Sequence, residues 1–124
     1  MRTIQCSDIS RTVARLCMEA NYTLPPEVQC ALEAGRKTER SPVGQAILED
    51  IEENFRYAGA CSIPICQDTG MAVVFCELGQ EVHIEGGLLE DAVNEGVRRG
   101  YLEGYLRCSV VADPLRRENT GDNT

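Results

Sequence analysis

The segment CSIPICQDTG, residues 61–70, separates two parts of the chain that differ in sequence pattern. Before it, apolar residues recur at helical spacing; after it comes MAVVFC at 71–76, a short apolar run typical of a buried strand. Within the segment, cysteine, amide, carboxylate and hydroxyl side chains follow one another and end at a glycine. A turn that opens into a strand can aim several such side chains and backbone N–H groups into one pocket. The segment therefore predicts a site with a metal-type ligand and a polar cradle for a substrate.

The part before residue 61 predicts three helices. Helical spacing of apolar residues over 9–20, with Ser7 or Asp8 as the N-cap, indicates the first helix, and Leu24-Pro25-Pro26 ends it. A second, shorter helix is expected from Pro26 to about Gly35. This half of the chain is therefore expected to be helical.

The third helix begins with a strong start signal, Ser41 followed by Pro42. Its expected apolar stripe consists of Val43, Ile47, Ile51 and Phe55. The acidic residues between them are expected to form a solvated face, and they are Glu49, Asp50, Glu52 and Glu53.

The part after residue 70 predicts a small sheet and a long helix. The run at 71–76 is expected to pair antiparallel with a half-exposed strand at 81–85, whose polar and apolar residues alternate. A helix is expected from about Leu88 to Leu102, and residues 107–111 are a further strand candidate. Three glycines at spacing four, which favour close packing or a backbone near a ligand, are Gly96, Gly100 and Gly104.

These elements predict an α+β fold, with a helical N-terminal part followed by a small sheet packed against the glycine-containing helix. The 124 residues are enough for one modest domain. The polar tail reads as a disordered terminus in its simplest interpretation, but Asn119-Thr120-Gly121-Asp122-Asn123 has the composition of a structured loop that continues into further sequence.

Composition and charge exclude several classes of protein. The chain has 12 Lys and Arg against 20 Asp and Glu, a net charge of −8, which argues against nucleic acid as a partner. No run approaches the roughly 20 apolar residues that span a bilayer, and the N-terminus lacks the apolar region of a signal peptide. We therefore expect a cytoplasmic protein with no membrane partner.

Seven cysteines are many for this length, but their number is odd and no secretion signal is visible. A disulfide framework is therefore not expected, and without a Cys-x-x-Cys pair neither is a zinc ribbon. Four cysteines are expected to pack as small hydrophobic residues: Cys6, Cys17, Cys30 and Cys108.

Cys66 is the best candidate for chemistry, because its thiolate would stand at a turn among polar groups. As a nucleophile it would need a base, and the single histidine, His83, lies on an expected strand, where a role-free histidine is common. As a ligand of an iron–sulfur cluster it would need two or three partner cysteines, and none of the other six is suitably spaced. The residues alone leave both interpretations open.

The sequence Pro64-Ile65-Cys66-Gln67-Asp68-Thr69-Gly70 resembles the signature of the class I fumarases and the related tartrate dehydratases, which are iron–sulfur hydro-lyases. The similarity extends through the glycine-rich helix and Tyr105-Leu106-Arg107 to Asn119–Thr124, and so covers most of the chain. It implies that residues 1–124 are the N-terminal part of an α-type catalytic subunit or domain, truncated at its C-terminal end.

The resemblance also implies a cofactor. Cys66 would be one of three ligands of a [4Fe–4S] cluster, and the other two cysteines would lie outside this chain. The 124 residues alone are then expected to be inactive and to hold no intact cluster, while Cys61 is not expected to be a ligand.

The remaining site residues implied by the resemblance bind a dicarboxylate. Arg107 would clamp a carboxylate, with Arg116 and Arg117 as weaker candidates, and Gln67 and Thr69 would add hydrogen bonds. Asp68 would bind substrate and orient a proton-transfer group as a catalytic residue, or else cap its own turn.

The function implied is the reversible hydration of fumarate to L-malate, a reaction of the tricarboxylic acid cycle. Dehydration of L(+)-tartrate to oxaloacetate is the close alternative, and a non-catalytic domain that binds a cluster or a subunit is an alternative of another class. We further expect an oligomer, in which exposed apolar surface and the glycine face of the helix pair with a β-type subunit, a C-terminal domain or another copy.

Overall fold

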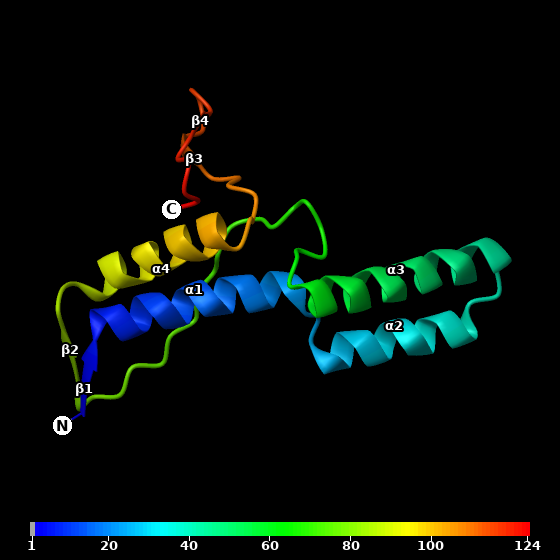
Figure 1. Cartoon of the computed structure of the whole chain (residues 1–124), viewed down its shortest axis with the longest axis horizontal. Coiled ribbons are helices and arrows are strands. Elements are labelled where there is room, and N and C mark those ends of the chain that lie inside the picture. Colours follow the sequence, from blue (N-terminus) through cyan, green and yellow to red (C-terminus); the bar gives the residue numbers. More distant parts are fainter. Residues whose placement is uncertain (1) are drawn as a thin grey trace. The chain divides into compact units, whose positions relative to one another are not determined.

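The computed structural model describes residues 2–124 and confirms an α+β fold in which helices dominate (Figure 1). Its elements in chain order are β1 (Arg2–Gln5), α1 (Cys6–Tyr22), α2 (Pro26–Thr38), α3 (Pro42–Cys61), β2 (Val82–Glu85), α4 (Leu89–Glu103), β3 (Val111–Asp113) and β4 (Glu118–Asn119). The chain forms two compact units. Unit 1 consists of the residues up to Glu19 together with Gln67–Thr124, and unit 2 is Ala20–Cys66.

The four expected helices are confirmed, with ends that differ by a few residues. α1 begins at Cys6, directly after β1, so Ser7 and Asp8 lie inside its first turn and the N-cap expected at one of them is wrong. The helix ends before the Leu24-Pro25-Pro26 sequence. α2 continues three residues past the expected Gly35, to Thr38. At the start of α3, the Ser41 hydroxyl accepts a hydrogen bond from the Gly44 N–H at 3.4 Å, as an N-cap does. None of the helices in residues 2–124 is both long and apolar enough to cross a membrane.

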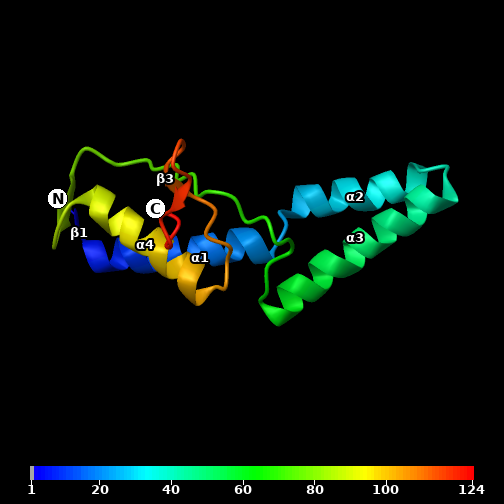
Figure 2. The ribbon, with the colours of Figure 1, turned by 90° about the horizontal axis from the view of Figure 1, so that it is seen from above.

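In unit 2, α2 and α3 form an antiparallel pair, seen from above in Figure 2. The expected apolar stripe of α3 is wrong in part, because Phe55 is buried but Val43, Ile47 and Ile51 are exposed. Glu52, expected on the solvated face, is only 2% exposed. It is buried because arginines approach it: its two carboxylate oxygens accept from Arg36 Nε at 3.0 Å and from an Arg56 guanidinium nitrogen at 3.2 Å.

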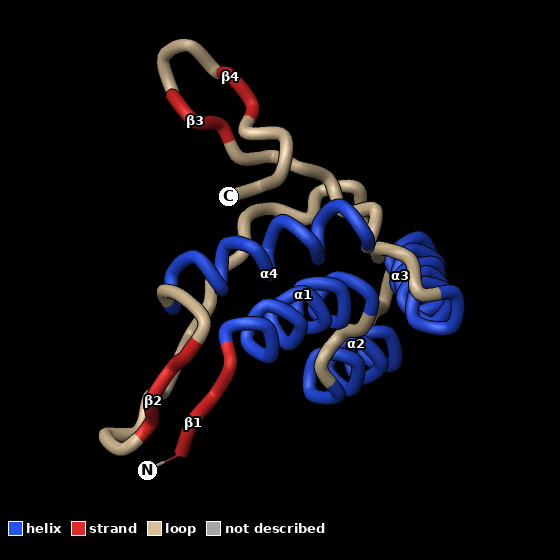
Figure 3. Tube along the Cα trace, turned by 60° about the vertical axis from the view of Figure 1, so that its left-hand side comes forward, coloured by secondary structure: helices blue, strands red, loops and turns tan. Residues whose placement is uncertain are grey.

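In unit 1, α4 packs along α1 through its glycines (Figure 3). A Cβ added at Gly96 would lie 2.6 Å from the Val13 Cβ, and one at Gly100 would lie 2.8 Å from the Ala14 carbonyl oxygen. The expected close packing is therefore confirmed, but its partner is α1 of the same chain. The proposal that this face pairs with another polypeptide is wrong for these two glycines.

The strands differ from the expectation in their pairing. β2 confirms the strand expected at 81–85, but its partner is β1, which is parallel to it with Ile4 opposite Ile84. The pairing follows from the helices, since β1 leads directly into α1 and β2 leads into α4. Residues 71–76 form no strand, and the antiparallel pairing expected for them is wrong.

After Arg107, side-chain hydrogen bonds to the backbone hold much of the chain in place. Of the strand expected at 107–111, only Val111 belongs to β3, which pairs antiparallel with β4. The N–H groups of Ser109 and Val110 instead donate to the side-chain oxygen of Asn123, at 2.7 and 3.0 Å. The loop at 119–123 is therefore structured, as its composition indicated.

Candidate active-site segment

Cys66 is the last residue of unit 2 and follows a short segment, residues 62–65, whose backbone is held by hydrogen bonds. α3 ends at Cys61, and Ser62 follows in the left-handed region with φ of 54°. Ile65 is then held twice: its N–H donates to the Asn21 carbonyl at 3.0 Å, and its carbonyl accepts from Asn54 Nδ2 at 2.9 Å. Cys66 is exposed at the next position. Its thiol thus stands at the end of a fixed backbone, as a ligand or nucleophile requires.

The second segment of unit 1 begins with the remainder of the motif, Gln67 to Gly70. Gln67 and Asp68 are exposed. A carboxylate oxygen of Asp68 accepts from the Gly70 N–H at 3.3 Å, and Gly70 has φ of 60°. Asp68 therefore caps its own turn, the simpler of its two expected roles.

Thr69 joins this turn to Arg107, 38 residues later. The Thr69 hydroxyl accepts from the Arg107 N–H at 2.9 Å and donates to the Arg107 carbonyl at 3.1 Å. Both hydrogen bonds are to backbone, so the Arg107 side chain is not used in them, and it belongs to an exposed residue. The structure thus brings together two of the residues expected to bind substrate, and the Thr69 hydroxyl holds the backbone of Arg107.

Two buried residues that the sequence analysis did not assign to the site hold the same turn. The Tyr101 hydroxyl lies 3.1 Å from the Thr69 carbonyl and 3.2 Å from the Gly70 carbonyl. Burial raises the pKa of the Tyr101 phenol above its ordinary value, with the neighbouring Cys17 and Cys108 adding to the increase. The phenol therefore stays protonated and remains a donor at neutral pH.

Asn123 completes this arrangement. It is 3% exposed, it has φ of 66°, and its Nδ2 donates to the Gly70 carbonyl at 3.1 Å. Since its Oδ1 accepts from Ser109 and Val110, one amide links the turn at 67–70 to the segment after Arg107. The signal in the sequence was the run of turn-forming residues at 119–123, where asparagine tolerates the left-handed conformation.

Other candidate residues lie elsewhere in the fold. Arg116 and Arg117 lie in the turn between β3 and β4, where Asp113 accepts from the backbone of Leu115 and Arg116, and both arginines are exposed. His83 is exposed on β2. Among the cysteines expected to pack, Cys6, Cys17 and Cys108 are half-buried, but Cys30 is exposed on α2, so its assignment to the core is wrong.

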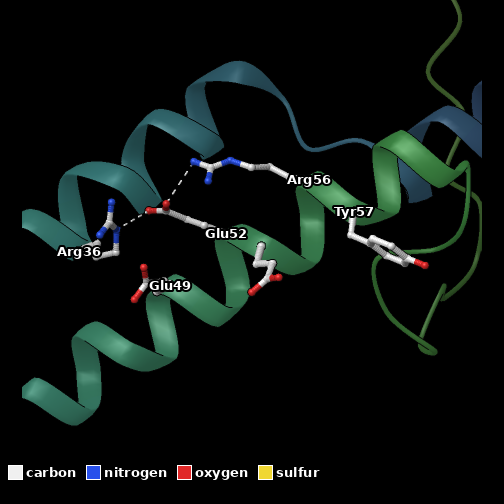
Figure 4. Close-up of a pocket in the computed structure, with 6 residues that line it drawn as sticks. Arg36, Glu49, Glu52, Arg56 and Tyr57 are labelled. Carbon is white, nitrogen blue, oxygen red and sulfur yellow. Dashed lines mark hydrogen bonds and ion pairs between the residues drawn. The ribbon is translucent and has the colours of Figure 1, made fainter.

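Unit 2 has a cavity of about 490 Å³ around the Glu52 ion pairs (Figure 4). Its lining residues are Arg36, Glu49, Glu52, Glu53, Arg56 and Tyr57. The two arginines both bind Glu52, and Arg56 also reaches Glu33 at 3.5 Å. The cavity is lined by three carboxylates, and both of its guanidinium groups already bind Glu52. It therefore does not suit a dianionic substrate.

The donor set for a metal is incomplete within residues 2–124. No group of three or more His, Cys, Asp or Glu side chains is arranged to hold a metal ion in this part of the chain. An exposed thiol on a pinned turn is, however, the ligand type that iron–sulfur clusters use. Cys66 therefore has the chemistry of a single cluster ligand, and the described residues do not provide a complete ligand set around it.

Comparison with known proteins identifies the family. The family model of fumarate hydratase (fumerase) matches residues 10–124. The chain belongs to this family.

Proteins named as a tartrate dehydratase subunit or as class I fumarate hydratases are similar over most of this chain. A protein of Methanocaldococcus jannaschii named as an L(+)-tartrate dehydratase alpha subunit is 37% identical over 116 residues, which are 93% of this chain and 40% of that protein. A protein of Geobacillus stearothermophilus named as a class I fumarate hydratase is 30% identical over 88% of this chain and 21% of its own length. The aerobic class I fumarate hydratase of Escherichia coli is 33% identical over 85% of this chain and 20% of its own length. The chain thus spans less than half the length of each of these relatives.

Proposed function

We propose that this chain is the N-terminal part of a hydro-lyase that adds water to the double bond of fumarate to give L-malate. Membership of the fumarate hydratase family supports the reaction class. The observation that carries the assignment of the site is the pair of hydrogen bonds between Thr69 and the backbone of Arg107, because they bring the motif after Cys66 next to a potential carboxylate clamp.

In this proposal Cys66 is one of three thiolate ligands of a [4Fe–4S] cluster, and the other two come from polypeptide outside this chain. When bound, the cluster supplies a Lewis acid that makes the substrate hydroxyl a better leaving group. Cys66 is suited to the role because both backbone polar groups of the preceding residue, the Ile65 N–H and the Ile65 carbonyl, are hydrogen-bonded. A single thiolate cannot retain the cluster, so we expect the 124 residues alone to be inactive.

The protein groups around the turn bind and orient the dicarboxylate. The Arg107 guanidinium offers a planar fork of N–H donors that matches a carboxylate, and it supplies positive charge in a chain of net charge −8. The Gln67 amide is free to rotate toward a second carboxylate from its exposed position. Asp68 remains a candidate for proton transfer or for orienting the group that carries it out.

A second substrate is favoured by one specific observation. The relative that is 37% identical and has 40% of its length matched is named as an L(+)-tartrate dehydratase alpha subunit. Such a name implies a beta subunit, so we propose a β-type partner or an equivalent C-terminal domain, and an oligomer. The cytoplasmic location expected from the acidic sequence stays a prediction.

The test uses the chain assembled with the polypeptide that completes the subunit and reconstituted with iron and sulfide without oxygen. We expect activity toward fumarate and malate, and activity toward tartrate alone would instead identify a tartrate dehydratase. Arg107→Ala is expected to reduce kcat/KM by about ten- to a hundredfold, since a charge-assisted hydrogen bond contributes roughly 1.5–3 kcal/mol. Its iron content should stay normal.

Arg116→Ala is the matched control, because Arg116 is an exposed arginine in the turn between β3 and β4. We expect it to keep the activity of the unmodified protein. An assembled protein that binds iron but turns over none of the three substrates would support the non-catalytic alternative. Equal activity of Arg107→Ala and the unmodified protein would exclude Arg107 as the clamp.

A further inference from the structure

Residues 71–78, which we call the open segment, have a sequence typical of a β-strand, but no strand pairs with them in residues 2–124. They read MAVVFCEL and form the loop that leads into β2 in Figure 1. The backbone hydrogen bonds of the loops, turns and strand pairs in residues 2–124 include none that begins or ends within this segment. Five of its large apolar side chains are exposed: Met71, Val73, Val74, Phe75 and Leu78.

The exposure has a pattern that indicates what is missing. In a strand, Met71, Val73 and Phe75 would share one face and Val74 would lie on the other. Both faces carry exposed apolar side chains, and Phe75 is 93% exposed. A strand that is apolar on both faces belongs in the interior of a sheet, with strands beside it and layers above and below. Exposed apolar patches of this kind mark interaction surfaces.

We propose that the open segment is a β-strand of the assembled catalytic subunit. Its partner is an extended strand of the remaining polypeptide of that subunit, the part that corresponds to the unmatched region of the tartrate dehydratase alpha subunit. That subunit has 60% of its length outside the match, which is enough to supply both a neighbouring strand and a covering layer. Backbone N–H and C=O groups of the two strands would pair, and alternate side chains would enter the new core.

A second copy of this chain fits the open segment less well. Pairing of two open segments would add one strand to one edge and would leave apolar side chains on both faces in contact with water. The proposal rests on the family and on the exposed segment, and it does not depend on the substrate or on the cluster. Its failure would therefore leave the proposed reaction untouched.

The test is amide hydrogen exchange of the whole 124-residue chain, alone and with a polypeptide made from the unmatched part of the Methanocaldococcus jannaschii alpha subunit. Alone, the amides at 71–78 should exchange as fast as those of an unstructured peptide at every protein concentration. In the mixture they should exchange at least about tenfold more slowly, because pairing places them behind an opening equilibrium. Unchanged exchange in a mixture that forms a complex would overturn the proposal.

Two pairs of variants separate strand pairing from general adhesion. Phe75→Ser should weaken the complex at least about tenfold, whereas Leu115→Ser should not, although Leu115 is also 93% exposed. Val74→Pro should abolish protection that Val74→Ala keeps, because only proline removes the backbone donor. Equal weakening by the two serine variants, or slow exchange that depends on the concentration of this chain alone, would contradict the proposed partner.

Discussion

Each of the two units is stabilised internally by a different kind of contact. In unit 1 the contacts are directed at the backbone: Gly96 and Gly100 lie against α1, and the side chains of Tyr101 and Asn123 bind carbonyl groups of the turn at 67–70. In unit 2, an ion pair links the two helices, because Arg36 of α2 binds the buried Glu52 of α3, and the buried apolar residues of α3 are Phe55 and Ala58. Backbone-directed contacts fix where the chain goes, and this is the unit that contains Gln67, Asp68 and Arg107.

The largest effect is expected when the backbone-directed contacts of unit 1 are removed. Asn123→Gly suits the φ of 66° but deletes hydrogen bonds to Gly70, Ser109 and Val110. We expect the free energy of unfolding to fall by about 2–3 kcal/mol, as measured by denaturant titration.

Asn119→Ala is the control, because the exposed Asn119 side chain also makes two hydrogen bonds that water can replace. It should lower the free energy of unfolding by about 1 kcal/mol or less. If the two variants lose the same amount, the amide of Asn123 does not hold the turn and the comparison fails for unit 1.

A second prediction compares a glycine of each unit. Gly96→Ala places a Cβ 2.6 Å from the Val13 Cβ and 2.7 Å from the Ser10 carbonyl oxygen, so α4 must move. We expect a loss of about 1–3 kcal/mol in the free energy of unfolding. Gly35→Ala meets no atom within 4 Å and should instead gain about 0.5–1 kcal/mol. Thermal unfolding of both variants measures the difference, and a gain in both would show that α1 and α4 are not in close contact.

The ion pairs of unit 2 should produce a smaller, salt-dependent effect. Arg36→Met removes one of two partners of the buried Glu52 carboxylate and should cost about 1–2 kcal/mol. Glu52→Leu should cost less, about 1 kcal/mol or below, because Arg36 and Arg56 are exposed enough to be solvated. A larger loss for Glu52→Leu than for Arg36→Met, in unfolding curves at low and high salt, would reverse this reading of the ion pairs.

The smallest effect concerns Asp122 in the loop at 119–123. Hydrogen bonds from the Thr124 backbone N–H and then from its hydroxyl hold the pKa of Asp122 below its ordinary value of 3.8. Because the folded pKa is depressed, this contribution to stability is complete above the unfolded pKa and is lost as the pH falls through the folded pKa. Carboxyl carbon shifts followed by NMR should show a midpoint below 3.8 that rises in Thr124→Val. A midpoint at or above that value would show that the loop is open in solution.

The sequence predicted the features that have a local cause. The Ser41-Pro42 start signal and the glycine spacing of α4 act within a few residues, and both appear in the structure as expected. The burial of Glu52 was missed because it depends on Arg36, 16 residues away on another helix. Without knowledge of the partner helix, a run of charged residues has the pattern of a solvent-exposed helix face.

The candidate site also combines features with a local signal in the sequence and features that depend on distant residues. The structured loop at 119–123 could be predicted from its composition, and the roles of the candidate site residues stay predictions. The contact between Thr69 and Arg107 spans 38 residues and has no local signal. The strand expected at 71–76 failed because strand formation needs a partner, and residues 2–124 place β1 beside β2 and no strand beside this run. An apolar sequence specifies a strand only together with what it pairs with.

In the proposed function, Cys66 ligates an iron–sulfur cluster in the complete hydro-lyase. Iron and sulfide content, measured together with fumarate hydration on the assembled protein, tests it most directly when Cys66→Ser is compared with Cys61→Ser. Both residues are exposed cysteines near the end of α3, so the pair controls for general damage to this region. We predict that Cys66→Ser loses both cluster and activity while Cys61→Ser keeps most of both; equal loss in the two variants, or a full cluster in Cys66→Ser, would contradict the account.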